Sequence, residues 1–453
     1  MKIIFESRRQ FGLGWAIGMM LLSTSLAWPA SPDGEGYDAM GGWKGLKSTP
    51  KRFFYVEQIQ GTWWFIDPAG SVFLSKGVNH VSYTADFSPA LGYSPYARAT
   101  EKKYGNAEAW SKAAAANLRA WRFNTIGAWC NPSMNQQEIP YTFILNIGSR
   151  AGANWVSGVF PDVFTDAFVQ AVRNVVLREC RSRRDDLHLL GYFTDNELRW
   201  GADWRKRHAL LFDFLALPED APGRRRVHEF LNSRYAAIEA LNQAWNTKVS
   251  RLDELASLQD LPESEARVRD ENAFLEILAA RYFQVCHDAI RAEDPNHLIL
   301  GCRFGGYAPE PVLRAMKDYV DVISYNTYNA TPPKEVLDKI HSLTGRPIVI
   351  TEFAFKAMDS GLPNTKGAGK PVPTQADRAR LFTGFVTELM KIPYVIGYHW
   401  FEYADEPAEG RFDGENSNYG LVNLQDEPWE TLTAEMTQTN ARMESVHAGT
   451  ATP

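Results

Sequence analysis

Two glutamates stand at the ends of strand-like apolar runs. Glu197 closes the run 188–197, and Glu352 lies in the run 347–353. An acidic side chain at the end of a buried strand is costly unless it is paired or used in chemistry. If both runs belong to one parallel sheet, the two carboxyl groups emerge at the same edge of that sheet. Two carboxyl groups about 5 Å apart can cleave a glycosidic bond with retention of configuration, one acting as acid and base and the other as nucleophile.

The elements that must position these glutamates alternate between β-prone runs and helical patterns. The β-prone runs are 72–79, 124–129, 143–148, 188–197, 298–304, 320–328, 347–353 and 395–403. Helical patterns between and after them include 109–121, 162–181, 311–317, 334–344 and 374–391, and a last one begins near Trp429. Such alternation is typical of a parallel sheet with crossover helices, and eight units close a barrel. The sequence therefore predicts an α/β fold, a (β/α)₈ TIM barrel, with Glu197 ending the fourth strand and Glu352 near the end of the seventh.

Three further segments modify this barrel. Residues 52–66 alternate aromatic and polar types around Gln60-Gly61, which predicts an N-terminal β-hairpin that caps the barrel floor. The connection 200–296 is mostly helical in composition and predicts a long helical insertion after the fourth strand, on the side where barrel enzymes vary their specificity. The Gly- and Pro-rich stretch 360–373 follows Glu352 and is a candidate lid or substrate-binding loop.

The pair Asn196-Glu197 on strand four, together with Glu352 on strand seven, resembles clan A of the glycoside hydrolases. Members of that clan are retaining (β/α)₈ enzymes, and the resemblance implies that Glu197 is the acid/base and Glu352 the nucleophile. Within the clan, the amino-acid sequences of segments 61–79 and 191–201 are most similar to those of the β-agarase family. The similarity runs from about Arg52 to Tyr419. Agarases of that family often carry a β-sandwich carbohydrate-binding domain before the barrel, whereas only the short stretch 28–51 precedes the hairpin here.

The same resemblance and the polar residues at other strand ends predict a substrate-binding site. Asn196 is expected to bind the sugar hydroxyl next to the anomeric carbon, and Tyr328, with Asn326 beside it, is expected to hold the nucleophile ionised. Trp400 is expected to form a platform under the sugar. The remaining candidates share a position at or near a strand end where a barrel otherwise buries apolar side chains: Asn79, His80, Trp129, Arg303, His399 and Glu402.

Composition narrows the function classes. Of the 453 residues, 45% are apolar and 23% are charged, as in ordinary soluble proteins, whereas 14 Trp is a large number and suits the stacking of sugar rings. The formal net charge of −6 argues against nucleic acid as a partner. Cys130, Cys180, Cys286 and Cys302 have no paired spacing, so we expect buried thiols rather than a bridge, and no metal site or cofactor.

The amino terminus reads as an export signal. Arg8 and Arg9 precede the apolar stretch 11–26, and small residues around Ala27 suit cleavage, so we interpret 1–27 as a signal peptide. The residues around the two arginines resemble a twin-arginine signal, and an ordinary secretory signal fits equally well. We expect 28–51 to be a linker and 52–453 the catalytic domain. No later apolar run is long enough for a membrane span, so the mature protein is expected in the periplasm or outside the cell.

These observations combine into one hypothesis and two alternatives. The hypothesis is an exported retaining β-glycoside hydrolase, agarase-like, that acts on a galactose-containing or related polysaccharide or oligosaccharide by double displacement. One alternative is a transglycosylase, which uses the same two carboxyl groups with a sugar in place of water as acceptor. The other is a catalytically silent carbohydrate-binding barrel, against which the presence of both glutamates argues. The sequence leaves open the sugar, exo or endo action and the oligomeric state.

Overall fold

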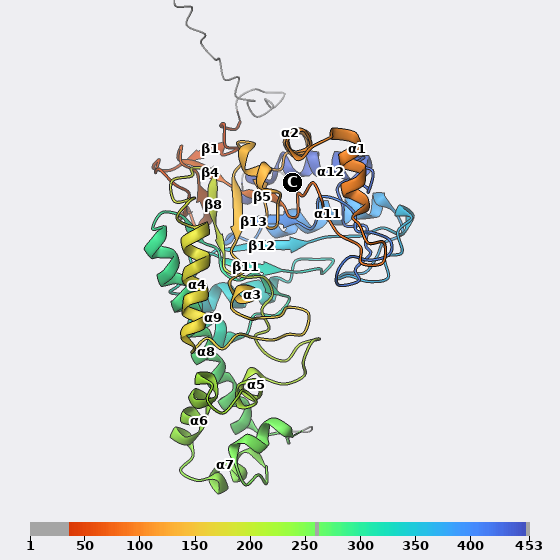
Figure 1. Cartoon of the computed structure of the whole chain (residues 1–453). Coiled ribbons are helices and arrows are strands. Elements are labelled where there is room, and N and C mark those ends of the chain that lie inside the picture. Colours follow the sequence, from red (N-terminus) through yellow and green to blue (C-terminus); the bar gives the residue numbers. More distant parts are fainter. Residues whose placement is uncertain (1–35, 259–261, 450–453) are drawn as a thin grey trace, which may run out of the picture.

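The computed structural model describes residues 36–258 and 262–449, which form two sheets and a surrounding layer of helices (Figure 1). The first sheet contains β1 (Trp43–Lys47), β2 (Tyr55–Ile59), β3 (Thr62–Ile66) and β4 (Ser71–Phe73). The second contains β5 (Ser75–Val78), β6 (Thr125–Ile126), β7 (Tyr141–Ile144), β8 (Leu189–Phe193), β9 (Leu298–Ile299), β10 (Phe304–Gly305), β11 (Ile323–Asn326), β12 (Ile348–Phe353) and β13 (Val395–Trp400).

The helices follow the strands along the chain. The α-helices are α1 (Pro95–Tyr104), α2 (Ala107–Ala120), α3 (Ile147–Arg150), α4 (Asp166–Glu179), α5 (Leu210–Leu215), α6 (Pro222–Arg234), α7 (Ile238–Trp245), α8 (Glu265–Glu293), α9 (Glu310–Met316), α10 (Lys334–Thr344), α11 (Gln375–Met390), α12 (Glu430–Asn440) and α13 (Met443–His447). Short 3₁₀ helices are η1 (Pro132–Gln136), η2 (Leu252–Ser257) and η3 (Met358–Ser360). Local signals set several boundaries; for example, Thr374 caps α11 reciprocally with Asp377.

The larger sheet is parallel and curls into a barrel. Its strand order is β10-β11-β12-β13-β5-β6-β7-β8-β9. The two edge strands, β9 and β10, are consecutive segments of the predicted fifth strand, so the two edges of the sheet meet within one stretch of chain. Left-handed backbone at Gly301 (φ 84°) and Arg303 (φ 50°) separates the two segments. The predicted (β/α)₈ barrel is confirmed, with its fifth strand divided and only η1 in place of a helix between β6 and β7.

The smaller sheet closes the barrel floor. Its antiparallel order is β1-β4-β3-β2, and β2 and β3 form the predicted hairpin around Gln60 and Gly61, both of which have positive φ. Apolar side chains of this sheet, such as Phe65 and Phe73, and the preceding Phe54 join the core inside the barrel with residues such as Ile396. The stretch expected as a linker is partly structured, because β1 lies within it and pairs with β4.

The C-terminal helix also reaches the floor. The carboxylate of Glu444 on α13 accepts hydrogen bonds from Lys76 Nζ (2.6 Å) and from the Tyr37 hydroxyl (2.9 Å). His447 Nε2 lies 2.9 Å from the carbonyl oxygen of Trp63 on β3. The two ends of the described chain therefore lie together at the amino ends of the barrel strands.

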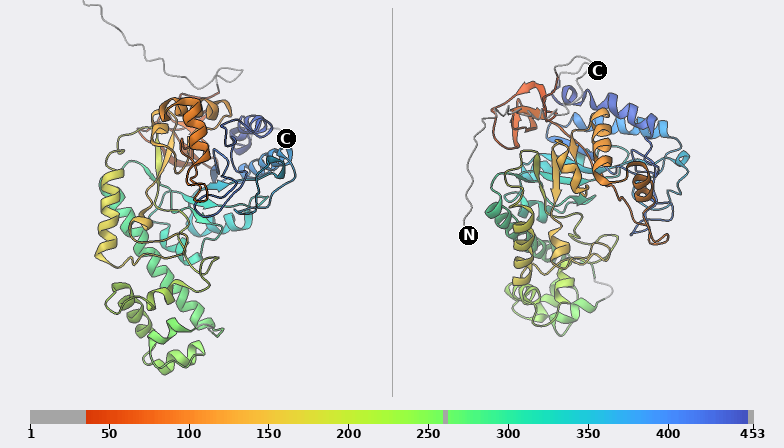
Figure 2. Two further views of the ribbon diagram at one scale, coloured as in Figure 1. Left: turned by 45° about the vertical axis from the view of Figure 1, so that its right-hand side comes forward. Right: turned by 45° about the horizontal axis from the view of Figure 1, so that its top comes forward.

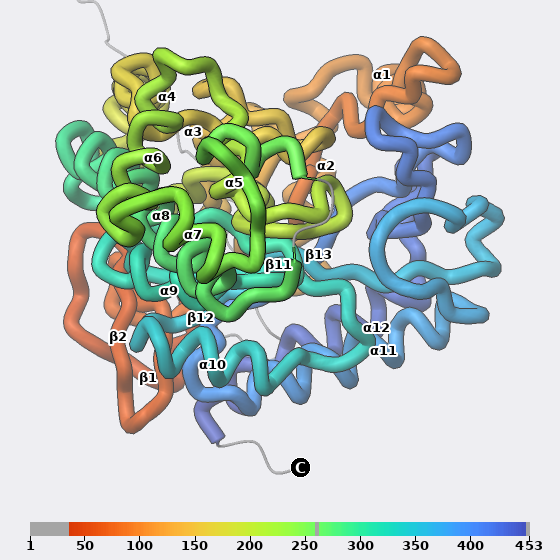
Figure 3. Tube along the Cα trace, turned by 90° about the horizontal axis from the view of Figure 1, so that it is seen from below, coloured from red at the N-terminus to blue at the C-terminus, as the bar shows by residue number. Residues whose placement is uncertain are grey.

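The insertion after the fourth strand is helical, as predicted, and projects from the barrel. Figures 1 and 2 show α5, α6 and α7 extending beyond the barrel, and in Figure 3, seen from below, these helices stand in front. The helix α8 begins in this projection and then runs back to the barrel, where it packs against α4 and α9. The insertion is thus anchored through a helix that also belongs to the outer layer.

An aromatic core joins strands β12 and β13 to helix α11. Phe353 stacks on Phe385 with ring centroids 4.9 Å apart, and Trp400 packs edge-on against Phe353 at 5.3 Å. Trp400 Nε1 donates to the carbonyl oxygen of Tyr419, which satisfies its polar atom within this core. This layer fixes the seventh and eighth strands of the barrel relative to α11.

Two sequence expectations concern cysteines and membranes. The thiols of Cys130, Cys180, Cys286 and Cys302 are free. No helix within 36–258 or 262–449 is both long and apolar enough to cross a lipid bilayer. The expected signal peptide 1–27 lies outside the described residues.

Candidate active site

A cleft with a volume of about 980 Å³ opens at the carboxyl ends of the barrel strands. Every strand position of the barrel contributes to its lining. The lining residues that follow or end the strands are His80, Trp129, Asn146, Glu197, Gly305, Asn326, Glu352 and Phe401. The two glutamates singled out from the sequence therefore share one cleft, as expected from the common edge of parallel strands.

Glu352 reaches the cleft through an irregularity in β12. Tyr325 pairs with Ile350 and the next residue, Asn326, pairs with Glu352, so β12 has one extra residue at this point. Arg303 Nη2 lies 2.8 Å from Glu352 Oε1, and the Tyr328 hydroxyl donates to Oε2 at 2.8 Å. Burial raises the pKa of Glu352 to about 7; the charge of Arg303 opposes this rise, the charge of Glu197 adds to it, and the Tyr328 hydrogen bond opposes it.

Glu197 is held by its backbone and by Asn326. Its φ of 49° is left-handed, and its N–H donates to the carbonyl oxygen of Arg303 at 3.0 Å. Asn326 Nδ2 donates to Glu197 Oε1 at 3.0 Å. A Cβ atom on Gly305 would lie 2.8 Å from the carboxyl carbon of Glu197, so glycine is needed there for the carboxyl group to fit. The side chain of Glu197 is half-buried, whereas Glu352 is buried.

Arg303 connects the parts of this site from behind. Its side chain is fully buried, and Nη1 donates to Asn196 Oδ1 at 2.9 Å while Nη2 donates to the Thr351 carbonyl oxygen at 2.9 Å. Its guanidinium group also lies over the ring of Trp129, 4.3 Å from the centroid. One cation therefore links residues of the fourth and seventh strand ends.

Five of the ten predicted substrate-binding residues line the cleft. They are His80, Trp129, Asn196, Asn326 and Tyr328. Tyr328 contacts Glu352 as expected. The amide oxygen of Asn196 accepts hydrogen bonds from Arg303 (2.9 Å) and Asn326 (3.2 Å). Because both bonds use the oxygen, the amide nitrogen of Asn196 is left to donate to a ligand.

The other five lie behind the cleft wall. Arg303 and Asn79 are buried, and the Asn79 amide bonds the carbonyl oxygens of Thr351 and Trp400. His399 faces the barrel interior with Nε2 2.8 Å from Ser75 Oγ, and burial lowers the pKa of His399 to about 3. These residues position backbone and side chains of the site and are not in its lining. Glu402 is also buried, at 1% exposure, beside His80.

The expectation for Trp400 is not met. Its side chain is 0% exposed in the aromatic core, and the next residue, Phe401, lines the cleft. The cause is an extra residue in β13, where Ile348 pairs with Val395 but Val349 pairs with Gly397. Such a bulge reverses which side chains face inward beyond it.

Sequence reasoning missed the loop residues that complete the lining. They include Asp86, Phe87, Trp155, Trp204, Arg411, Phe412 and Glu415. The rings of Trp155 and Trp204 pack edge-on with centroids 6.2 Å apart, and Arg205 lies over the Trp204 ring at 4.3 Å. These residues lie on long connections rather than at strand ends, so the strand-end pattern carries no signal for them.

Backbone geometry marks the same edge of the barrel. Non-glycine residues with positive φ follow, or interrupt, the first five strand positions in turn: His80 (51°), Trp129 (57°), Asn146 (50°), Glu197 (49°) and Arg303 (50°). Each such conformation costs of the order of 1 kcal/mol for a residue with a side chain. The cost is repeated along one edge of the sheet, where four of these side chains line the cleft and the fifth supports it.

Comparisons of sequence and structure show that this chain is similar to β-agarases. No family model matches the chain. It is 27% identical over 503 aligned residues to β-agarase B of Vibrio sp. (strain JT0107), covering 95% of this chain and 52% of that protein. The crystal structure of an agarase matches with a TM-score of 0.78 and 27% identity over 91% of this chain and 68% of the other. An exo-β-agarase structure, 24% identical, shares the fold with a TM-score of 0.80 over 92% of this chain and 68% of the other.

The relatives differ from this chain in length. The chain spans about half the length of the curated relatives it matches. The alignment nevertheless covers nearly all of this chain, and its homologues include glycoside hydrolases of the β-agarase type.

Proposed function

We propose that this chain is a retaining β-glycoside hydrolase of the β-agarase type, acting on agarose-like or related galactose-containing polysaccharide. The observation that carries the proposal is the pair Glu197 and Glu352 in one cleft, in unlike surroundings. Glu352 is buried against a guanidinium and a phenol, whereas Glu197 is half-buried and bonded by a neutral amide. Unequal surroundings of this kind assign unequal roles to two carboxyl groups.

In the first half of the reaction, Glu352 is the nucleophile. Its carboxylate attacks the anomeric carbon while the bond from that carbon to the leaving oxygen breaks, and Glu197 donates its proton to the leaving oxygen. Arg303 and Tyr328 hold the Glu352 carboxylate in place and favour its charged form. The first product departs, and the sugar remains bonded to Glu352.

In the second half, Glu197 acts as base. It takes a proton from water as the water oxygen attacks the anomeric carbon, and the bond to Glu352 breaks. Two displacements at one carbon restore the β configuration. The amide nitrogen of Asn196 donates to the sugar, and the aromatic rings of Phe401, Trp155 and Trp204 supply stacking surface along the cleft.

Proton NMR in the first minutes of hydrolysis tests the stereochemistry. We expect the β anomer to form first, because a covalent sugar–Glu352 intermediate is hydrolysed with a second inversion. An initial α product would show an inverting site and refute the proposed roles. A panel of agarose, other galactans and unrelated polysaccharides, with products sized by mass spectrometry, tests the substrate class.

Replacement of the nucleophile gives the first prediction. Glu352→Ala should lower the rate by several orders of magnitude, since it removes the covalent route. Azide should then partly restore turnover of an aryl glycoside and give a product of inverted configuration. Glu335→Ala, an exposed glutamate on α10, is the matched control and should keep full activity. If Glu352→Ala keeps more than about a tenth of the activity, a loss below about 1.4 kcal/mol of barrier, Glu352 is not the nucleophile.

Export belongs to the same proposal. The basic pair and apolar stretch within 1–27 support it. Mass spectrometry of the protein recovered from the growth medium or periplasm should show cleavage after Ala27. Retention of the uncleaved chain inside the cell would contradict export without bearing on the reaction.

A further inference from the structure

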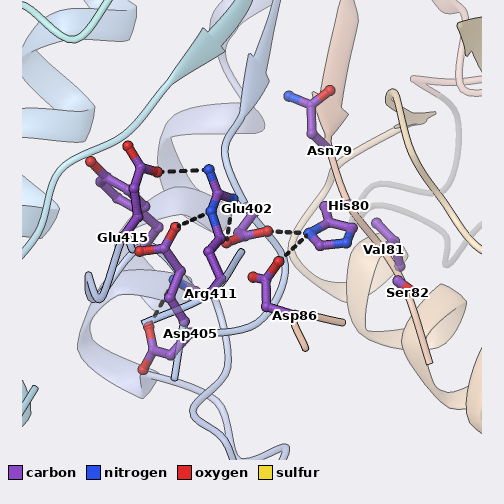
Figure 4. Close-up of polar contacts among 12 residues, drawn as sticks. Asn79, His80, Val81, Ser82, Asp86, Glu402, Asp405, Arg411 and Glu415 are labelled. Carbon is purple, nitrogen blue, oxygen red and sulfur yellow. Dashed lines mark hydrogen bonds and ion pairs between the residues drawn. The ribbon is translucent and has the colours of Figure 1, made fainter. Parts of the chain in front are cut away.

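A second polar group borders the cleft beside the two glutamates. It consists of His80, Asp86 and Glu402, and we call it the His80 cluster (Figure 4). His80 Nδ1 bonds Glu402 Oε2 and lies 3.9 Å from Asp86 Oδ1. One potential ligand atom from each residue lies within 4.8 Å of the other two. The cluster joins the segment after β5 to the segment after β13, two regions far apart in sequence.

The surroundings of the His80 cluster are rich in negative charge. Arg411 is shared among Glu415 (2.7 Å), Asp413 (3.0 Å), Glu406 (3.3 Å) and Glu402 (3.9 Å). Figure 4 shows its guanidinium group between Glu415 and Glu402. One guanidinium cannot neutralise four carboxylates, and Asp86 adds a fifth nearby. Charge of this density is costly in a buried place unless protons or a further cation balance it.

Two buried oxygens of the His80 cluster have no hydrogen-bond partner among the described residues. They are Asp86 Oδ2 and Glu402 Oε1. Asp86 is 6% exposed and Glu402 is 1% exposed, so both carboxyl groups are largely shielded from solvent. A buried carboxylate oxygen without a hydrogen-bond partner is expensive. The other oxygen of each group lies nearest His80, whereas Glu402 Oε1 lies 3.9 Å from Arg411 Nη1. A bound cation can accept lone pairs from both carboxyl groups at once.

We propose that His80, Asp86 and Glu402 bind a divalent transition-metal ion of the zinc or manganese kind. One imidazole nitrogen with two carboxylates suits these ions, whereas an all-oxygen set would favour calcium or magnesium. The ion takes the place of the direct His80–Glu402 hydrogen bond. Three protein ligands leave a coordination position open, and it faces the cleft, because His80 (19% exposed) and Asp86 both line it.

The bound ion positions one wall of the cleft. It ties His80 and Asp86, on the segment that carries Phe87, to Glu402, on the segment that carries Phe412. Its open position is available to a sugar hydroxyl. This inference goes beyond the proposed hydrolysis, in which no step passes through a metal, and its test does not depend on activity.

The experiment measures metal binding to the full chain directly. After treatment with EDTA, the protein is titrated calorimetrically with ZnCl₂ and with MnCl₂, and bound metal is counted by inductively coupled plasma mass spectrometry. We expect one ion per chain. Asp86→Asn and Glu402→Gln keep the side-chain shapes and should each weaken binding more than about 10-fold, as loss of a charged ligand requires. Cobalt substitution should give a visible absorption spectrum that changes in His80→Gln.

The matched control is a histidine–carboxylate pair elsewhere. His228 Nε2 lies 3.0 Å from Asp253 on the projecting insertion, outside the cleft, and His228→Ala should leave binding unchanged. Circular dichroism verifies that each variant is folded. Absence of stoichiometric binding to the folded wild-type chain, or binding that survives both Asp86→Asn and Glu402→Gln, would overturn the inference. If Glu352→Ala loses activity but still binds the metal ion, the inference of a metal site is supported independently of the proposed reaction.

Discussion

At the scale of single residues, opposing influences act on the Glu352 carboxyl group. Burial raises its pKa to about 7, whereas Arg303 and Tyr328 lower it. Attack on the sugar requires the ionised form, so activity should fall as the pH drops below about 7. As the pH falls, the Glu352 carboxylate gains a proton and loses its nucleophilic form. The acid limb of the pH profile therefore reports on the pKa of this group.

A change of Tyr328 tests this assignment. Tyr328→Phe removes a hydrogen bond that favours the ionised carboxylate, so the acid limb of kcat/KM should move to higher pH. Tyr325→Phe is the matched control, because the Tyr325 hydroxyl donates to the Gly306 carbonyl oxygen and not to Glu352. A shift of equal size in both variants, or a shift toward lower pH in Tyr328→Phe, would contradict the role of the Tyr328 hydroxyl.

Glu197 has a signature of its own. Glu197→Gln keeps the Asn326 contact near its usual geometry but cannot donate a proton to the leaving oxygen. Natural glycosides should lose about 100-fold or more in rate, whereas an aryl glycoside with an acidic phenol should keep its first step, because that phenol needs little protonation. Rates are compared on both substrates. Equal losses would remove Glu197 from the acid/base role.

At the scale of elements, the extra residue in β13 decides which aromatic ring lines the cleft. Trp400 lies in the core with Phe353, and Phe401 lines the cleft. Trp400→Leu should lower the free energy of unfolding by about 3 kcal/mol, from lost burial and a new cavity, with little change in KM. Phe401→Leu should cost less stability and raise KM. Urea unfolding and kinetics of the folded enzyme measure both, and the reverse pattern would return the platform role to Trp400.

The elements also show what the sequence could predict. A barrel strand is buried on both faces, as β12 and β13 are, so hydrophobic alternation does not reveal which side chains point inward. The sequence predicts that the strand ends carrying Glu197 and Glu352 are functional, because a carboxyl group at the end of a buried strand is costly. The bulges that turn the Glu352 side chain toward the cleft and the Trp400 side chain into the core could not be predicted, since an extra residue in a strand leaves no mark in composition. The division of the fifth strand at Arg303 was equally hidden.

At the scale of the whole molecule, one buried ion pair connects the barrel to the C-terminal helix. Lys76 on β5 and Glu444 on α13 are both almost fully buried, 2.6 Å apart. Glu444→Gln leaves the Lys76 charge without its partner, so the free energy of unfolding should fall by about 3–5 kcal/mol. Glu430→Gln, at the exposed start of α12, should change it by less than about 0.5 kcal/mol. A loss below about 1 kcal/mol for Glu444→Gln in urea unfolding would show that this pair does not hold the C-terminal helix.

The overall plan was predictable and the cleft rim was not. The alternation of strand and helix, the hairpin at Gln60-Gly61 and the helical insertion are local patterns, which sequence periodicity records. Residues such as Asp86, Trp204 and Arg411 reach the cleft on long loops, and their positions depend on contacts between distant segments. The His80 cluster is of this kind, because its members come from opposite ends of the chain.

The two ends of the described chain meet at the barrel floor, where Tyr37 bonds Glu444 and His447 contacts Trp63. The cleft opens at the opposite end of the strands. A tether at either end of the described chain would therefore leave the cleft facing away from the point of attachment. Under the proposed function, a chain immobilised in this way on a bead or a cell surface would present its cleft to an insoluble polysaccharide that cannot diffuse to it.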